Sequence, residues 1–193
     1  MKREHRRRSI RLRETDYSVS GFYFITICAQ NRECLFGEVI GGEARLNKYG
    51  EAALEELLDI SNHRPNVIID EYTVMPNHIH VIIGITDQCR GMACHAHKSD
   101  DTNNRGLASQ TPTRQFANPI PGSLATIIGS YKSAVTRRIN IIRQSPSDAV
   151  WQRNYYEHIV RNDKSLNQIR QYIRDNPFNW GVDENNPMCL RAK

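Results

Sequence analysis

The chain has 193 residues, with 26 lysines and arginines against 21 aspartates and glutamates, and a formal net charge of +5. This length suits one domain with a substantial hydrophobic core. No apolar segment long enough for a signal peptide or a membrane span follows the basic start, so we expect a soluble, cytoplasmic protein with no membrane partner. The odd number of cysteines, five at irregular spacing, argues against a disulfide framework.

Composition divides the chain into four parts. We expect a basic N-terminal arm over residues 1–20, one domain over residues 21–187, a polar flexible insertion within it at about 89–121, and a tail over residues 188–193. The insertion contains Cys89 and Cys94-His-Ala-His97, which are soft metal ligands. Because flexible sequence does not fix ligands in place, this cluster is a weak candidate for a zinc site.

Periodicity predicts a mixture of strands and helices. In chain order we expect a strand over 21–28, a hairpin over 36–46 that turns at Gly41-Gly42, a helix over 47–63, strands over 66–74 and 78–86, a helix from Ser123 to Ile142, a strand over 150–160, and a helix from Asn162 or Asp163 to Asn176. Pro65 and Pro177 end two of these helices, because the residue before proline disfavours helical angles. We expect the segment from Phe178 onward to be a packed terminus with little chemistry of its own.

Two histidines stand two residues apart at the start of an apolar strand. Residues at this spacing share a strand face, so His78 and His80 are expected to point away from the apolar side chains between and after them. Two imidazoles about 6.5 Å apart along a strand can converge on one cation. With an oxygen donor they leave coordination positions open for a substrate, and Mg²⁺ or Mn²⁺ suits phosphate oxygens. The alternative is a half-buried strand whose wet face carries two histidines.

Basic side chains gather in the second half of the chain. No acidic residue lies between Asp101 and Asp148, and the cations of the helix that begins at Ser123 lie off its apolar stripe. We predict phosphate contacts from Lys132, Arg137, Arg138, Arg153 and Arg161, and from Arg11 and Arg13 of the arm. An ordinary solvated helix face and a disordered tail are the alternatives.

Several tyrosines are candidate nucleophiles. Tyr172 and Asn176 are four residues apart on one helix and therefore share a face, whereas Tyr155 and Tyr156 lie in sequence typical of a strand. A phenol has a pKa of about 10, so it needs a base, a positive neighbour or a metal-polarised phosphate to react. Attack on a phosphodiester would give a phosphotyrosine that keeps the energy of the broken bond and permits rejoining. The residues alone do not choose among these tyrosines.

Five sequence blocks follow one another along the chain. They are Tyr23-Phe-Ile-Thr-Ile-Cys, Met75-Pro-Asn-His-Ile-His, Gly129-Ser-Tyr-Lys-Ser-Ala-Val-Thr, Trp151-Gln-Arg-Asn-Tyr-Tyr-Glu-His-Ile-Val-Arg161 and Gln171-Tyr-Ile-Arg-Asp-Asn-Pro177. From about residue 8 to residue 187, this order resembles the REP-associated tyrosine transposases, which are single-tyrosine members of the HUH superfamily. The resemblance implies an α+β fold of HUH endonuclease type, with a ferredoxin-like antiparallel sheet and packed helices.

The resemblance also implies a chemistry. The family cleaves and rejoins single-stranded DNA beside hairpins of repetitive extragenic palindromes, through a 5′-phosphotyrosine intermediate. It implies that Tyr172 is the nucleophile, that His78, His80 and Asn176 bind Mg²⁺ or Mn²⁺, and that His158 and Lys132 steady the scissile phosphate. Related insertion-sequence transposases have a glutamine where Asn176 stands. The expected protein is bacterial, nucleoid-associated, and a monomer or homodimer.

Two alternatives remain open at this stage. A non-catalytic nucleic-acid-binding module of the same fold would bind DNA hairpins without forming a covalent adduct. A zinc hydrolase would stay active after the loss of every tyrosine.

Overall fold

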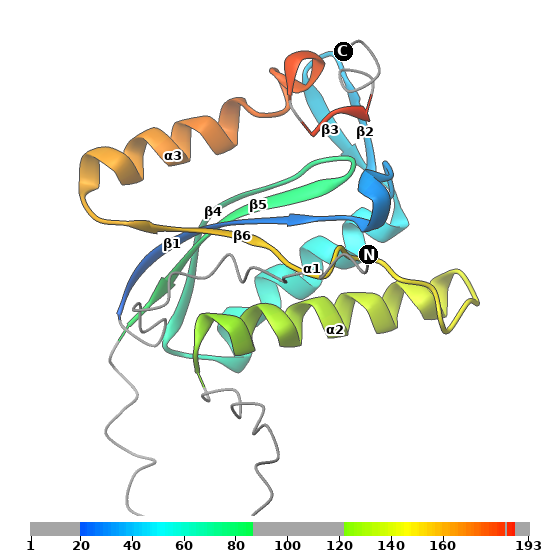
Figure 1. Ribbon diagram of the computed structural model, residues 1–193, viewed down its shortest axis with the longest axis horizontal. Helices are drawn as coiled ribbons and strands as arrows, with labels where there is room; N and C mark the ends of the chain where they lie inside the picture. The colour runs from blue at the N-terminus through cyan, green and yellow to red at the C-terminus, as the bar shows by residue number, and fades with distance from the viewer. Residues whose placement is uncertain (1–19, 87–121, 184, 188–193) are drawn as a thin grey trace, which may run out of the picture.

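The computed structural model describes residues 20–86, 122–183 and 185–187 (Figure 1). The expected arm up to residue 19, the insertion and the tail lie outside the described residues. So do Arg11, Arg13 and the Cys89–His97 cluster. Among the residues that are described, no helix is both long and apolar enough to cross a membrane.

Four strands form one antiparallel sheet. Its order is β4 (Val67–Val74), β5 (His78–Ile85), β1 (Gly21–Cys28) and β6 (Tyr156–Val160). With helices α1 (Lys48–His63) and α2 (Leu124–Ile142), the chain runs β1-α1-β4-β5-α2-β6, which is the order of the ferredoxin-like fold. The predicted α+β fold, with an antiparallel sheet and packed helices, is confirmed.

The two faces of the sheet carry different helices. Helices α1 and α2 pack against one face, and α3 (Asp163–Asp175) lies across the other (Figure 1). The main hydrophobic core lies on the α1/α2 face, where Ile25 and Val81 of the sheet meet Val135 of α2. A smaller cluster around Ile82 and Ile173 lies beneath α3. The α1/α2 face therefore supplies most of the apolar burial, and the α3 face supplies less.

Ion pairs attach α3 to the edge strand β4. Arg170 donates from Nε and Nη2 to the two carboxylate oxygens of Asp70, at 2.8 and 2.6 Å. Arg174 donates to Glu71 at 2.7 Å. The pairing of β4 with β5 shifts register between Ile69 and Tyr72, at the position of these two acids. Bidentate arginine–carboxylate pairs fix geometry as well as charge, so they help to set where α3 lies.

Most predicted boundaries are confirmed. The hairpin consists of β2 (Gly37–Ile40) and β3 (Glu43–Leu46), and its two turn glycines have φ of 62° and 84°, which glycine tolerates best. The side chains of Asn47, Ser123 and Asn162 each accept a hydrogen bond from a backbone N–H in the first turn of α1, α2 and α3. Short 3-10 turns, η1 (Gln30–Arg32) and η2 (Trp180–Val182), were not predicted.

Two predictions are wrong. The strand expected over 150–160 begins only at Tyr156. Before it, the Nζ of Lys132 on α2 donates hydrogen bonds to the carbonyl oxygens of Gln152 and Asn154, at 2.6 and 3.4 Å, so these carbonyls do not pair with a strand. Before β6, Trp151 makes only an isolated bridge to β1. The terminus after α3 is not uniformly packed, since Phe178 is 81% exposed.

Two helical glycines provide a matched test of the fold. A Cβ on Gly50 would lie 2.1 Å from the carbonyl oxygen of Phe36, whereas a Cβ on Gly129 would meet nothing within 4 Å. We expect Gly50→Ala to lower the free energy of unfolding by about 1–3 kcal/mol through overpacking. Gly129→Ala should raise it by up to about 1 kcal/mol through helix propensity. Urea denaturation measures both, and equal effects would contradict this packing.

Candidate functional site

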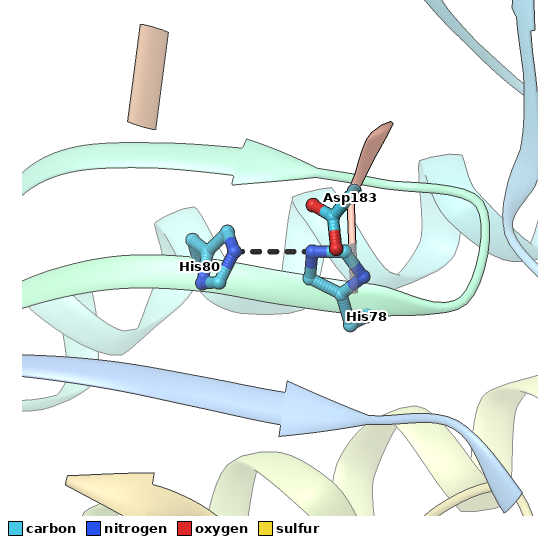
Figure 2. Close-up of side chains that lie close together, drawn as sticks. All are labelled: His78, His80 and Asp183. Atoms are coloured by element: carbon cyan, nitrogen blue, oxygen red, sulfur yellow. Dashed lines mark hydrogen bonds between the residues drawn. The ribbon is translucent and has the colours of Figure 1, made fainter. Parts of the chain in front are cut away.

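The two histidines of β5 form the centre of the site. His78 is 0% and His80 2% exposed, and both project from the α3 face of the sheet (Figure 2). Their Nε2 atoms lie 3.0 Å apart. The predicted shared face is therefore confirmed, but the alternative of a wet face is wrong, because every residue of β5 is buried. Two nitrogens that bind one cation at about 2.1 Å and at a right angle would lie about 3.0 Å apart, which matches this spacing.

Asn77 determines how His78 is protonated. The Asn77 amide nitrogen donates to the carbonyl oxygens of Arg32 and Asn185, at 3.0 and 2.7 Å. Its amide oxygen must therefore face His78 Nδ1, 2.8 Å away, and accept the proton that this nitrogen carries. A neutral imidazole protonated at Nδ1 has a lone pair on Nε2. This lone pair points toward the second histidine, where a cation ligand is needed.

Thr26 supports His80 in either of two tautomers. Its hydroxyl lies 2.8 Å from His80 Nδ1. When His80 donates from Nε2 to His78, the hydroxyl donates to Nδ1. When Nε2 is to bind a cation, the proton belongs on Nδ1 and the hydroxyl accepts it. A hydroxyl can rotate between these roles, so Thr26 allows both states without moving the ring.

Both imidazoles are held neutral. Burial lowers the pKa of His78 to about 4, and Arg32 adds to this effect, while Asp183 and Asn176 oppose it. Burial, followed by the neighbouring His78, lowers the pKa of His80 well below its ordinary value. Neutral imidazole is the form that binds metals, so protons do not compete for this site near pH 7.

Two oxygen-bearing side chains complete the cluster. His78, His80 and Asp183, which follows η2, have ligand atoms within 4.8 Å of one another (Figure 2). Asn176 is 3% exposed and donates to Asp183 at 3.2 Å, while its own Oδ1 is buried without a hydrogen-bond partner among the described residues. A carboxylate and an uncommitted amide oxygen are ligands that Mg²⁺ and Mn²⁺ prefer. The donor set therefore fits a divalent cation.

Tyr172 reaches the same cluster from α3. Its hydroxyl lies 3.4 Å from His80 Nε2, and its ring stands edge-on to Phe24 of β1, with centroids 6.0 Å apart. The residue is 48% exposed. A pocket of about 490 Å³ opens beside it and is lined in part by His80, Thr26 and Arg32. The structure thus brings Tyr172 together with the histidines and, one turn later on α3, with Asn176.

The structure does not bring every predicted residue to this pocket. His158 is exposed on β6, opposite Phe24 in register, and is not one of the residues that line the pocket. The Nζ of Lys132 donates hydrogen bonds to backbone carbonyl oxygens, and burial lowers the pKa of this side chain. Arg138 pairs with Glu55 and Glu56 of α1, on the opposite face of the sheet. Arg137, Arg153 and Arg161 are exposed.

Sequence reasoning missed three contributors. Asn77 lies inside the recognised block but received no role, although an amide beside a histidine is a common orienting group. Thr26 gave no signal, because only the pairing of β1 with β5 places it opposite His80. Asp183 gave none either, since a 3-10 turn carries it back to the histidines.

Comparisons with known proteins identify relatives of the chain. No family model matches it. An uncharacterized protein of Haemophilus influenzae is 40% identical over 180 residues, which cover 93% of each chain, and this chain belongs to the same family as that protein. A solved structure of a REP-associated tyrosine transposase bound to a REP hairpin has a TM-score of 0.53 at 17% identity, covering 88% of this chain and 74% of the other. The chain is therefore similar in fold to a REP-associated tyrosine transposase.

Sequence supports the same relationship. A second Haemophilus influenzae protein, described as a "Putative REP-associated tyrosine transposase", is 24% identical over 170 residues, which cover 88% of this chain and 77% of that one. The chain shares the fold of the hairpin-bound REP-associated tyrosine transposase, as its sequence blocks predicted. The roles of individual site residues stay predictions.

The buried histidines make stability depend on pH. Their pKa values are lowered in the folded protein, so below pH 6.5 the unfolded chain binds more protons and stability is lost as the pH falls toward about 4. The shift of His78 from 6.5 to about 4 corresponds to roughly 3 kcal/mol. Urea denaturation in EDTA at several pH values measures this loss. His78→Gln should flatten the dependence, whereas His63→Gln, on the exposed face of α1, should not. Identical curves for these two variants would contradict the assignment.

Asn77 is expected to act on metal affinity through His78. Asn77→Ala removes the acceptor that keeps the His78 proton on Nδ1, so Mn²⁺ should bind about 10–100-fold more weakly. Titration calorimetry measures the affinity. Asn62→Ala is the control, because that exposed amide donates only to Asp59 on α1, at 2.9 Å. Equal affinities of the Asn77→Ala variant and the wild type would rule out the orienting role.

Proposed function

We propose that the protein is a metal-dependent transposase that cleaves and rejoins single-stranded DNA beside hairpins of repetitive extragenic palindromes. The observation that carries this proposal is the 3.4 Å approach of the Tyr172 hydroxyl to His80 Nε2, between residues 92 positions apart. The named relatives support a transposase-like function, and the hairpin-bound neighbour supports a DNA hairpin as substrate.

In this proposal the cluster holds Mg²⁺ or Mn²⁺. His78 and His80 would hold it through Nε2, and the oxygen ligands would come from Asn176, as the resemblance implied, and from Asp183. The bound cation would supply positive charge beside a phosphate oxygen. Asn77 and Thr26 hold the two imidazoles in the required tautomers.

Tyr172 is the nucleophile of the proposed reaction. Its oxygen forms a bond to phosphorus while the bond between phosphorus and the 3′ oxygen breaks. The phenol gives up its proton to water, and the departing oxygen takes a proton from water to become a 3′-hydroxyl. The product is a 5′-phosphotyrosine, and a 3′-hydroxyl attacking its phosphorus reverses the step and rejoins DNA. The ring contact with Phe24 and the ion pairs of α3 hold the phenol in position.

The basic residues are assigned to the DNA backbone. Arg137, Arg153 and Arg161 are exposed cations that can contact phosphates, and the arm with Arg11 and Arg13 extends this set. Lys132 is assigned an indirect role, because it holds the segment that contains Gln152 and Asn154. His158, on the edge strand β6, is assigned a contact with the DNA phosphate. The protein would then work at the bacterial nucleoid as one domain over residues 21–187. The tyrosine and the histidines come from one chain, so a monomer or a homodimer would suffice.

An adduct assay with matched tyrosines tests the proposal. The protein is mixed with a labelled single-stranded hairpin and Mn²⁺, and covalent adduct is detected by denaturing electrophoresis. We expect the wild type and Tyr156→Phe to form adduct, because Tyr156 is 53% exposed and contacts Phe24, but no described contact joins it to the histidines. Tyr172→Phe should form none.

Other results would contradict the proposal in specific ways. Hairpin binding without adduct under any divalent cation would favour a non-catalytic module. Hydrolysis that survives Tyr172→Phe would favour a hydrolase instead.

A further inference from the structure

We infer that a groove beside α2, on the far side of the returning chain from Tyr172, binds the single-stranded flank of the DNA substrate. The inference rests on the proposed function. The groove has a volume of about 860 Å³ and lies between the C-terminal half of α2 and residues 144–153. After α2 the chain turns back along this helix toward β6 (Figure 1).

Charge lines both walls of this groove. Arg137 stands on α2, Arg153 stands on the returning segment, and none of the lining residues is acidic. Both arginines are exposed. Cations on two facing walls suit a polyanion that runs between them, because its phosphates can contact either side.

Part of the lining of the groove is apolar. Pro146, Ala149 and Val150 contribute to it, and so does Ile141, which is 71% exposed. An exposed isoleucine beside arginines has no packing role in the α1/α2 core. Unpaired bases present flat apolar faces that can cover such a surface, whereas a duplex hides these faces in its stack. The combination of apolar lining residues and exposed arginines therefore favours a single strand over a hairpin stem.

The groove and the pocket beside Tyr172 share one lining residue. Gln152 lines both. Its backbone N–H donates to the carbonyl of Cys28 at 3.0 Å, and the neighbouring Trp151 Nε1 donates to the carbonyl of Lys132 at 3.1 Å. These bonds hold the returning segment against both β1 and α2. A strand that leaves the pocket over Gln152 therefore enters a surface that is already formed.

Two adjacent arginines on α2 make the inference testable. Arg137 lines the groove, whereas Arg138 makes ion pairs with Glu55 and Glu56 of α1. Their side chains carry the same charge from neighbouring positions. Only Arg137 is directed to the proposed DNA path, so the two should differ in their effect on flank binding.

The experiment measures equilibrium binding of labelled hairpins in EDTA, where no adduct forms. One hairpin carries a single-stranded flank of about ten nucleotides, and the other carries none. For the flanked hairpin, the R137Q/R153Q double variant should bind roughly tenfold more weakly than the wild type. The slope of log K against log salt should fall in magnitude by about 1.4, since each lost single-strand phosphate contact contributes about 0.7. The hairpin without a flank should show a much smaller loss.

Each alternative outcome overturns the inference. Equal losses for both hairpins, in a double variant whose thermal melting matches that of the wild type, would mean that the groove binds the stem. A loss in R138Q equal to that in R137Q would mean that the general charge of α2 governs binding. No loss in the double variant would remove the groove from the DNA path. Absence of a covalent adduct with the wild type would contradict the proposed function, but the binding measurement, which is made in EDTA, could still be interpreted.

Discussion

The structure depends on the burial of two neutral imidazoles side by side between the sheet and α3. Burial removes the imidazoles from water, and their lowered pKa values keep them uncharged. The amide of Asn77 then decides which nitrogen of His78 carries the proton. Every other element of the site is arranged around this pair: Thr26 supports one ring, and Asn176 and Asp183 supply oxygen atoms beside them. A single buried hydrogen bond thus sets which nitrogen of His78 keeps its lone pair.

The two faces of the sheet have different roles: one carries most of the hydrophobic core, and the other carries the candidate site. On one face, α1 and α2 bury the large apolar core, which tolerates little change. On the other face, α3 buries only Leu166 and Ile173 and otherwise depends on charged contacts with β4. The helix that carries Tyr172 is therefore the one with the least apolar attachment.

The sequence predicted the elements that follow local rules. The start of a helix at Ser123 and the Gly41-Gly42 turn depend on neighbouring residues, so they could be predicted from the pattern. The shared face of His78 and His80 follows from strand geometry alone. Asp183 could not be predicted in this way, because its approach depends on a turn after α3. Likewise, the loss of strand before Tyr156 depends on Lys132, which lies on a different element.

The register shift in β4 has a consequence for the nucleophile. In a regular strand, neighbours such as Asp70 and Glu71 would point to opposite faces, and only one could reach α3. Between Ile69 and Tyr72 the chain takes three steps where β5 takes two, so one extra residue is accommodated. Both acids therefore meet arginines of α3, one turn apart. This irregularity on the outer strand β4 therefore gives α3 two ion pairs to the sheet, which fix the helix that carries Tyr172 at two points along its axis.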